Sequence, residues 1–289
     1  MDPLALVSLP RLMSRTRGRR NLRVGLIDGR VNSARSEFAD ASFEFLRAQD
    51  GGPSRVGRGS FHGTAVAGIL VAERGSGAPG ICPGVTLLVR SVFSDAEPAA
   101  TTYRELASAI VELVEAGARI VNVSLAVNQR TAEAGRTLRE ALDHAFRREV
   151  IIVAAAGNQR AMAGSPVTRH RSVVPAVAYD LQGRPSAISN LGHSIGWRGI
   201  GAPAEGITSL APGQGLKPFG GTSAAAAVVT GTVALLCSEF PQASTAELMY
   251  TLSRVGDRRA SVVPPLLNAW TAFEALRTMR RVRGCRDGR

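Results

Sequence analysis

The stretch "FGGTSAAAAVVTGTVALL", residues 219–236, places a single serine at the start of a strongly apolar segment. Two glycines and a threonine precede Ser223, and the alanine, valine and threonine residues after it predict a buried helix. Serine is favoured at helix starts because its side-chain oxygen accepts a hydrogen bond from a free backbone N–H. Taken alone, the stretch favours a helix cap, so any chemical role for Ser223 depends on the rest of the chain.

The rest of the chain alternates between two kinds of segment. Short β-branched apolar runs predict strands, and longer amphipathic or alanine-rich stretches predict helices. The predicted strands are 22–28, 85–93, 118–126, 150–157 and 173–180, and the predicted helices are 63–73, 103–117 and 137–149. Apolar strands that alternate with helices indicate a parallel sheet covered on both faces. We therefore predict an α/β fold with a mostly parallel central sheet.

Local signals place the loops and two helix starts. Residues 50–60 and 74–84 are rich in glycine, proline and serine and predict loops. Thr102 with Glu105 and Ser244 with Glu247 have the spacing of capping boxes. No break in composition marks a second folded unit, so we predict a basic N-terminal arm at 1–21, one α/β domain at 22–255, and a basic C-terminal helix and tail at 256–289.

Composition narrows the class of protein. The chain has 289 residues, of which 45% are hydrophobic and 20% charged, and these values are typical of a globular protein. No apolar run free of charge approaches the length of a transmembrane helix. The N-terminal apolar run follows an acid and precedes arginines, the wrong order for a secretory signal. The three cysteines are too sparse for a disulfide framework. We expect a cytoplasmic protein, without membrane contact, that uses no metal or other cofactor.

The chain is strongly basic, with a formal net charge of +12. All but one of its 35 basic residues are arginine, and Lys217 is the exception. Many of them lie near the two ends: Arg11, Arg15, Arg17, Arg19, Arg20 and Arg23, then Arg277, Arg280, Arg281, Arg283, Arg286 and Arg289. They indicate either solvated termini with a compositional skew or a surface for an acidic partner. No zinc-finger or aromatic RNA-binding signature is present, so we expect no nucleic-acid partner. The sequence leaves the oligomeric state open.

Four polar residues lie near the ends of the predicted apolar strands and helices. Asp28 ends the first predicted strand, and Asn158 comes at the end of strand 150–157. His62 directly precedes the helix predicted from residue 63, and Ser223 begins the alanine-rich helix. The carboxyl ends of parallel strands meet at one edge of a sheet, where ligands collect. We therefore expect these four side chains to face the same edge.

Together, these side chains have the chemistry of covalent catalysis. A serine hydroxyl needs a base within hydrogen-bond reach, and the base needs a partner that fixes its tautomer. His62 is suited to the base, Asp28 to the partner, and the N–H groups at the Ser223 helix start and the Asn158 amide to stabilising an oxyanion. Each residue also has a structural alternative: Asp28 in a turn or cap, His62 as a buried histidine, Asn158 in a turn after Gly157, and Ser223 as a cap.

Five motifs in order decide between these alternatives. "GLIDG", "FHGTAVAGIL", "IVNVSLA", "IIVAAAGN" and "FGGTSAAAAVVTG" resemble the signatures of the subtilisin-like serine proteases, over about residues 22 to 255. The resemblance implies a three-layer α/β sandwich and a serine endopeptidase that works through an acyl-enzyme. It implies a triad of Asp28, His62 and Ser223, with Asn158 in the oxyanion hole. It also implies substrate-binding segments at Ser124, Leu125 and Ala126 and at Ala155, Ala156 and Gly157.

The chain departs from the family pattern at several positions. Gly29 stands where the family usually has Ser or Thr, so one hydrogen bond to the Asp28 carboxylate is expected to be missing. Ala65 replaces a second histidine, and Ala224 and Ala227 replace a methionine and a proline after the serine. No acidic cluster predicts a tight calcium site.

The chain is similar to compact intracellular subtilases that mature ribosomally made peptide natural products. This similarity rests on its short length, on the absence of a recognisable signal or pro-domain, and on the motifs "LIDG", "SNLG" and "FGGTSAA". That similarity implies a peptide or protein substrate, with an acidic leader peptide as the candidate. A peptide ligase or macrocyclase on the same acyl-enzyme, and a catalytically inactive peptide-binding module, are the alternative functions.

Overall fold

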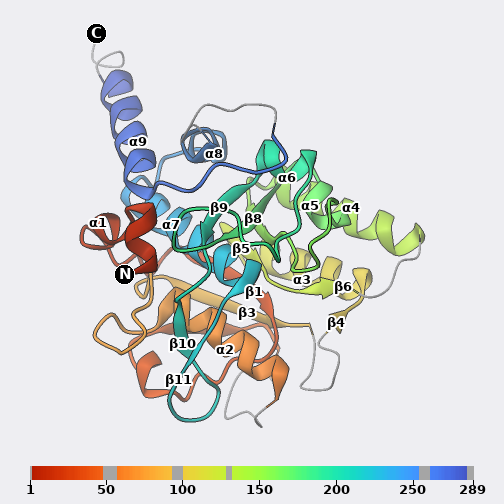
Figure 1. Ribbon diagram of the computed structural model, residues 1–289, viewed down its shortest axis with the longest axis horizontal. Coiled ribbons are helices and arrows are strands. Elements are labelled where there is room, and N and C mark those ends of the chain that lie inside the picture. The colour runs from red at the N-terminus through yellow and green to blue at the C-terminus, as the bar shows by residue number, and fades with distance from the viewer. Residues whose placement is uncertain (1, 48–56, 93–99, 128–131, 254–260, 285–289) are drawn as a thin grey trace.

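The computed structural model describes residues 2–47, 57–92, 100–127, 132–253 and 261–284 (Figure 1). Its centre is a seven-stranded sheet with the order β2-β3-β1-β5-β7-β8-β9, in which every neighbouring pair is parallel. The strands of this sheet are β1 (Arg23–Asp28), β2 (Ser42–Phe45), β3 (Thr86–Ser91), β5 (Ile120–Val123), β7 (Ile151–Ala155), β8 (Val173–Tyr179) and β9 (Ile200–Pro203).

Two small sheets and the helices surround this centre. The small sheets pair β4 (Ala100–Thr101) with β6 (Ala126–Val127), and β10 (Thr208–Leu210) with β11 (Leu216–Pro218). The helices are η1 (Pro3–Val7), α1 (Leu9–Met13), η2 (Ser36–Phe38), α2 (Arg58–Val71), α3 (Tyr103–Glu115), α4 (Ala132–Arg147), α5 (Pro166–Arg169), α6 (His193–Arg198), α7 (Gly221–Glu239), α8 (Thr245–Ser253) and α9 (Ala269–Gly284).

The sheet is buried on both faces, as its apolar strands require. Along β7, Ile151 and Val153 pack into a core with α2 and α7, whereas Ile152 and Ala154 pack into a second core with α3 and α4. This alternation follows from the two-residue period of a strand. The predicted α/β sandwich with a mostly parallel sheet is confirmed.

Two predicted boundaries are wrong. The segment expected as one strand at 118–126 ends its pairing in the main sheet at Val123 and continues as β6, which pairs with β4 in a separate sheet. The helix expected from residue 63 begins at Arg58, so His62 lies inside α2 rather than before it. Gly57 and Gly59 are predicted as loop residues by composition, but Gly29, directly after β1, packs against the backbone of α2 at Gly59, and this contact leaves no room for a side chain at Gly29.

Helix α7 is the central helix of the core. All of its residues from Thr222 to Ser238 are buried. Helix α7 is long and apolar enough to cross a membrane, contrary to the expectation from its sequence. However, 94% of its apolar stretch is buried inside the protein. We therefore assign α7 to the core of the fold.

One of the two predicted capping boxes is complete, and the other forms only in part. The Glu247 carboxylate accepts a hydrogen bond from the Ser244 N–H at 2.8 Å, and the Ser244 hydroxyl accepts one from the Glu247 N–H at 3.2 Å, which completes the predicted box. At α3, Thr102 accepts from the Glu105 N–H at 3.1 Å, whereas the Glu105 carboxylate bonds Arg90 and Arg47. Thr102 is therefore the N-cap of α3, and Glu105 serves an ion-pair cluster.

The N-terminal segment packs onto the domain rather than standing in solvent. Val7, Leu9 and Leu12 are fully buried in the core that also contains residues of α7 and α9. Arg11 lies over the ring of Trp270 at 3.8 Å, and Arg15 forms an ion pair with Glu239 at 3.4 Å. Basic residues of this segment thus have local partners, and its apolar residues join the N-terminus to α9.

We expect Leu12→Ala to lower the free energy of unfolding by about 2–5 kcal/mol, because it leaves a cavity in this core. Urea unfolding followed by circular dichroism measures the loss. Val111→Ala, at a side chain 37% exposed on α3, is the control and should cost far less. Equal unfolding midpoints for Leu12→Ala and the unmodified protein would show that the segment is only loosely attached.

Candidate active site

Three side chains from three elements meet in a line at the carboxyl edge of the sheet. His62 Nδ1 lies 2.7 Å from Asp28 Oδ1, and His62 Nε2 lies 3.0 Å from Ser223 Oγ. Asp28 ends β1, His62 lies in α2, and Ser223 lies in the first turn of α7. A carboxylate, an imidazole and a hydroxyl in this order can move a proton from the hydroxyl to the ring.

Ser223 does not cap its helix. Gly220 occupies the N-cap position of α7 and makes no side-chain hydrogen bond. The Ser223 hydroxyl is directed instead to His62. The buried apolar helix behind Ser223 points its N-terminus toward this site, where its dipole favours negative charge.

Opposing effects set the proton affinity of His62. Burial lowers the pKa of the ring, but the charge of Asp28 and its hydrogen bond to Nδ1 raise it, and the net pKa lies above the ordinary value of histidine. The phenyl ring of Phe219 packs edge-on against the imidazole, with ring centroids 5.3 Å apart. Asp28 therefore stabilises the charged ring that proton transfer from Ser223 would create.

The Asp28 carboxylate is held through one oxygen. Oδ1 accepts hydrogen bonds from the Gly29 N–H at 2.7 Å and from His62, whereas the buried Oδ2 has no partner in the described parts of the chain. This fits the missing hydrogen bond that was expected from Gly29. A Cβ at Gly29 would lie 2.2 Å from the carbonyl oxygen of Gly59, so the glycine permits α2 to pack directly against the end of β1.

We therefore expect Gly29→Ser to destabilise the fold by about 1–3 kcal/mol, the usual cost of forcing atoms into a packed contact. The added hydroxyl is not expected to donate a hydrogen bond to Asp28 Oδ2, because the backbone of α2 must move before a side chain fits at position 29. The control is Gly213→Ser, where a Cβ meets nothing within 4 Å. Differential scanning calorimetry of both variants tests this. An unfolding temperature for Gly29→Ser equal to that of the control would contradict the close contact.

Asn158 lies beside the start of α7. Its Oδ1 accepts hydrogen bonds from the Thr222 N–H and the Thr222 hydroxyl, both at 3.0 Å. The amide nitrogen lies 3.1 Å from the position that a Cβ on Gly221 would take, which places it near the Ser223 turn. Asn158 thus anchors the helix start through its oxygen, and within the described residues no hydrogen bond uses its nitrogen.

Asn190 is a site residue that sequence reasoning missed. Its Oδ1 accepts from the backbone N–H groups of Gln159 and Ala161, at 3.0 and 2.9 Å, and its N–H donates to the carbonyl of Gly157 at 2.8 Å. Gly157 has a φ of +105°, and a Cβ there would meet the Asn190 amide at 2.3 Å. Asn190 therefore fixes the loop that carries Asn158, and only the "SNLG" motif hinted at it.

The expected substrate-binding segments lie on the same edge. Ser124 is buried, and its hydroxyl donates to Asn122 Oδ1 at 2.7 Å. Leu125 packs at the margin of the core beneath α3 and α4, and the backbone of Ala126 belongs to β6. Ala155 ends β7, followed by buried Ala156 and by Gly157, whose N–H donates to Thr222 Oγ1 at 3.2 Å. Both segments follow strands that flank one another, β5 and β7.

Metal ligands do not gather anywhere in the described ranges. Among those residues, no group of three or more histidine, cysteine, aspartate or glutamate side chains is placed to hold an ion. Cys82 and Cys237 are buried free thiols, and burial raises the pKa of Cys82 to about 12 and that of Cys237 to about 11. Neither thiol is a reactive nucleophile at neutral pH.

Fold and site together define a subtilisin-like serine protease. Residues 20–260 match the model of the Subtilase family, Peptidase S8. The chain belongs to this family, as its motifs predicted.

Several solved structures superpose on most of this chain. A mutant protease domain of PatA superposes with a TM-score of 0.83 and 32% identity, covering 90% of this chain and 97% of that one. The Prenylagaramide maturation protease PagA gives a TM-score of 0.81 and 29% identity, covering 93% and 98%. The PatG macrocyclase domain shares the fold, with a TM-score of 0.79, at 22% identity.

Sequence relatives include bacterial serine proteases, some of them longer than this chain. Subtilisin DY of Bacillus licheniformis is 29% identical over 243 residues, which are 81% of this chain and 82% of that protein. The Thermophilic serine proteinase of Bacillus sp. (strain AK1) is 32% identical over 181 residues, and the match spans 62% of this chain but only 43% of that protein.

Proposed function

We propose that this chain is a maturation protease that hydrolyses a peptide bond in a ribosomally made precursor peptide, with Ser223 as nucleophile. The observation that carries the catalytic part is the continuous hydrogen-bonded line from Asp28 through His62 to Ser223. The likeness to PatA and PagA over nine-tenths of the chain supports the precursor peptide as substrate.

The geometry supports a stepwise reaction. Ser223 Oγ attacks the carbonyl carbon of the scissile bond while its proton passes to His62 Nε2, 3.0 Å away. The C–N bond then breaks, and the departing amine takes that proton from His62, which leaves an acyl-enzyme. Water attacks the acyl group and gives a proton to His62. The bond between the acyl carbon and Ser223 Oγ then breaks, His62 returns the proton to Oγ, and the new carboxyl end leaves.

The oxyanion of each tetrahedral intermediate lies near two donors. The Ser223 N–H is free at the helix start, because the first N–H groups of a helix lack intrahelical partners. The Asn158 amide nitrogen is the second donor, held in place because its oxygen is bonded to Thr222. Such preorganised donors stabilise charge that develops only in the transition state.

We expect Asn158→Ala to lower kcat by roughly 10²–10³-fold with little change in KM. It also removes the acceptor at the start of α7, so Asn158→Asp is the informative companion: it keeps an acceptor oxygen and loses the donor. Steady-state kinetics on both variants, beside thermal unfolding, separate the two roles. Normal kcat in a folded Asn158→Asp protein would confine Asn158 to anchoring the helix.

The substrate assignment is tested with synthetic precursor peptides and mass spectrometry of the products. Hydrolysis gives two fragments whose masses sum to that of the substrate plus one water, whereas ligation or macrocyclisation gives a product without that water. Cleavage at one site between leader and core supports the proposal. Unselective cleavage of unrelated proteins, with the precursor peptides left intact, would overturn the maturation role and leave a general protease.

A further inference from the structure

A second concave site lies on the opposite edge of the sheet from Ser223. This groove, which we call the rear groove, has a volume of about 460 Å³, and its lining includes Phe146, Ile151, Arg171, Val173, Arg198 and Met249. It lies at the first residues of β7 and β8, whereas the Ser223 site lies beyond the last residues of the strands. Its volume falls in the range of ligand sites.

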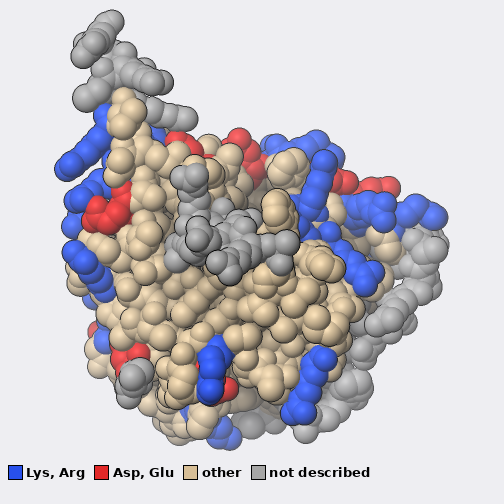
Figure 2. Space-filling view, turned by 45° about the horizontal axis from the view of Figure 1, so that its top comes forward, with Lys and Arg blue, Asp and Glu red and all other residues tan. Residues whose placement is uncertain are grey.

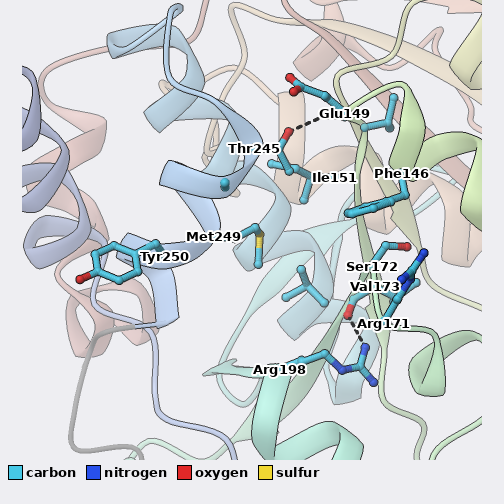
Figure 3. A pocket seen from close by; sticks show the side chains of 13 residues that line it. Phe146, Glu149, Ile151, Arg171, Ser172, Val173, Arg198, Thr245, Met249 and Tyr250 are labelled. Carbon is cyan, nitrogen blue, oxygen red and sulfur yellow. Dashed lines mark hydrogen bonds between the residues drawn. The ribbon is translucent and has the colours of Figure 1, made fainter.

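The walls of the rear groove are apolar and come from different elements. Figure 3 shows Phe146 of α4 and Met249 of α8 on opposite sides of it, with Ile151 at the upper end of the gap and Val173 below Phe146. Phe146 is 48% exposed, which is unusual for a large aromatic side chain with a core nearby. The walls therefore form an apolar pocket that can bind a large apolar side chain.

Positive charge gathers at one end of the rear groove. Arg171 and Arg198 lie together at that end in Figure 3, whereas Glu149 and Thr245 lie at the other. Arg171 is 76% exposed and lies over the Phe146 ring at 5.4 Å. Its ion pair with Asp143 is long at 3.7 Å.

Backbone carbonyls, and no carboxylate in the described parts of the chain, hold the Arg198 guanidinium. It donates to the carbonyls of Thr168, Arg169, His170 and Val173. In the described parts of the chain, no carboxylate lies within ion-pair distance of it. Figure 2 also shows Lys and Arg side chains in blue, with some Asp and Glu side chains in red among them, along the upper right of the molecule, the side on which α4 and α6 lie in Figure 1. A groove with this character suits a ligand that has an apolar side chain next to carboxylates.

We infer that the rear groove binds an acidic segment of the substrate peptide, with a leucine or phenylalanine between the Phe146 and Met249 side chains and carboxylates facing Arg171 and Arg198. This inference rests on the proposed function. The seven residues of β8 separate the two edges by about 20 Å, at 3.3 Å per residue. A peptide that runs round the surface between them needs roughly ten or more extended residues. The segment therefore belongs to a part of the precursor remote from the cut bond.

Binding is measured without catalysis, on Ser223→Ala protein. The probe is a fluorescein-labelled 14-residue peptide of glutamate, aspartate, leucine and phenylalanine. Two matched probes replace its acids by glutamine and asparagine, or its leucines and phenylalanines by serine. Fluorescence anisotropy should show that both replacements weaken binding. We expect Phe146→Ser and Arg171→Glu each to weaken binding of the first probe roughly tenfold, as anchor residues of an interface do.

Two matched variants make the comparison specific. Val111→Ser removes another exposed apolar side chain on a helix, and Arg139→Glu makes the same charge change on exposed α4. Both should bind like the Ser223→Ala parent. Equal binding by Phe146→Ser and the parent, or no binding of the acidic probe, would overturn the inference. A dimer in gel filtration that Phe146→Ser breaks would show that a second copy of the chain occupies the groove, and would also overturn it.

Kinetics keep this inference separate from the proposed function. In otherwise unmodified enzyme, Phe146→Ser should lower kcat/KM for a long precursor and leave kcat/KM for a short peptide with the same cleavage site unchanged. If the short peptide is cleaved and the acidic probe does not bind, the rear-groove inference fails while the protease stands. If the probe binds and no peptide is cleaved, the proposed function fails.

Discussion

Replacing Ser223 with alanine is expected to lower kcat for peptide hydrolysis by ~10⁶-fold, the loss that follows when the nucleophile of such a triad is removed. The hydroxyl is the only group in the described site that is hydrogen-bonded to the candidate base and placed at a helix N-terminus. Without it, no acyl-enzyme forms. What remains is the contribution of substrate binding and of the oxyanion donors, worth ~10³–10⁴-fold over water.

The fold should survive this substitution. Ser223 does not cap α7, so alanine removes no helix cap, and alanine is the residue that follows it in the sequence. His62→Ala should be nearly as inactive, and the double variant no worse than either single one, because the residues act as a unit. Single-turnover assays with a fluorogenic peptide measure these rates. Full activity in purified Ser223→Ala protein would refute the role assigned to Ser223.

Asp28→Asn is expected to cost about 10⁴-fold in kcat, because the neutral amide no longer holds His62 in the tautomer that accepts the serine proton. It should also change the pH profile. His62 acts as a base only when neutral, so activity falls as pH drops through its pKa. With Asp28 present that pKa is raised, and the acid limb of kcat/KM should lie above the ordinary histidine value of about 6.5.

Removing the charge of Asp28 leaves burial of the ring as the dominant influence, and burial lowers the pKa of His62. The acid limb of the Asp28→Asn variant should therefore move to lower pH, on a much lower plateau. Profiles of kcat/KM from pH 5 to 9 test this. An acid limb at the same pH in both proteins would mean that a group other than His62 controls the profile.

The fold and three of the four site positions were predictable because they follow from local patterns, whereas His62 lies inside α2 and not before a helix. Each apolar β-branched run predicted a strand, and the structure places a strand of the main sheet within every one of them. As expected, Asp28 ends a strand, Asn158 follows a strand, and Ser223 lies at the start of a helix. The parallel sheet therefore brings the three residues to one edge. The order of five motifs then assigned them chemistry that no single residue supports.

What escaped prediction depends on contacts between distant segments. Helix α2 begins at Arg58, in a stretch that composition alone predicts as a loop, and its backbone packs against Gly29 through contacts that leave no room for a side chain at Gly29 or Gly63. The N-terminal segment read as a basic arm, although its three buried apolar residues find their partners in α7 and α9. Asn190 and the rear groove likewise arise from residues far apart in the chain.

The most direct test of the account is labelling of the protein with a fluorophosphonate, which phosphonylates an activated serine. Mass spectrometry should find one adduct, on the peptide that contains Ser223. Labelling should be absent in Ser223→Ala and strongly slowed in His62→Ala and Asp28→Asn, because the hydroxyl is activated by the base and its carboxylate. An unlabelled Ser223 in folded protein, or an adduct that persists in Ser223→Ala, would contradict the central claim that Asp28, His62 and Ser223 form a working nucleophile.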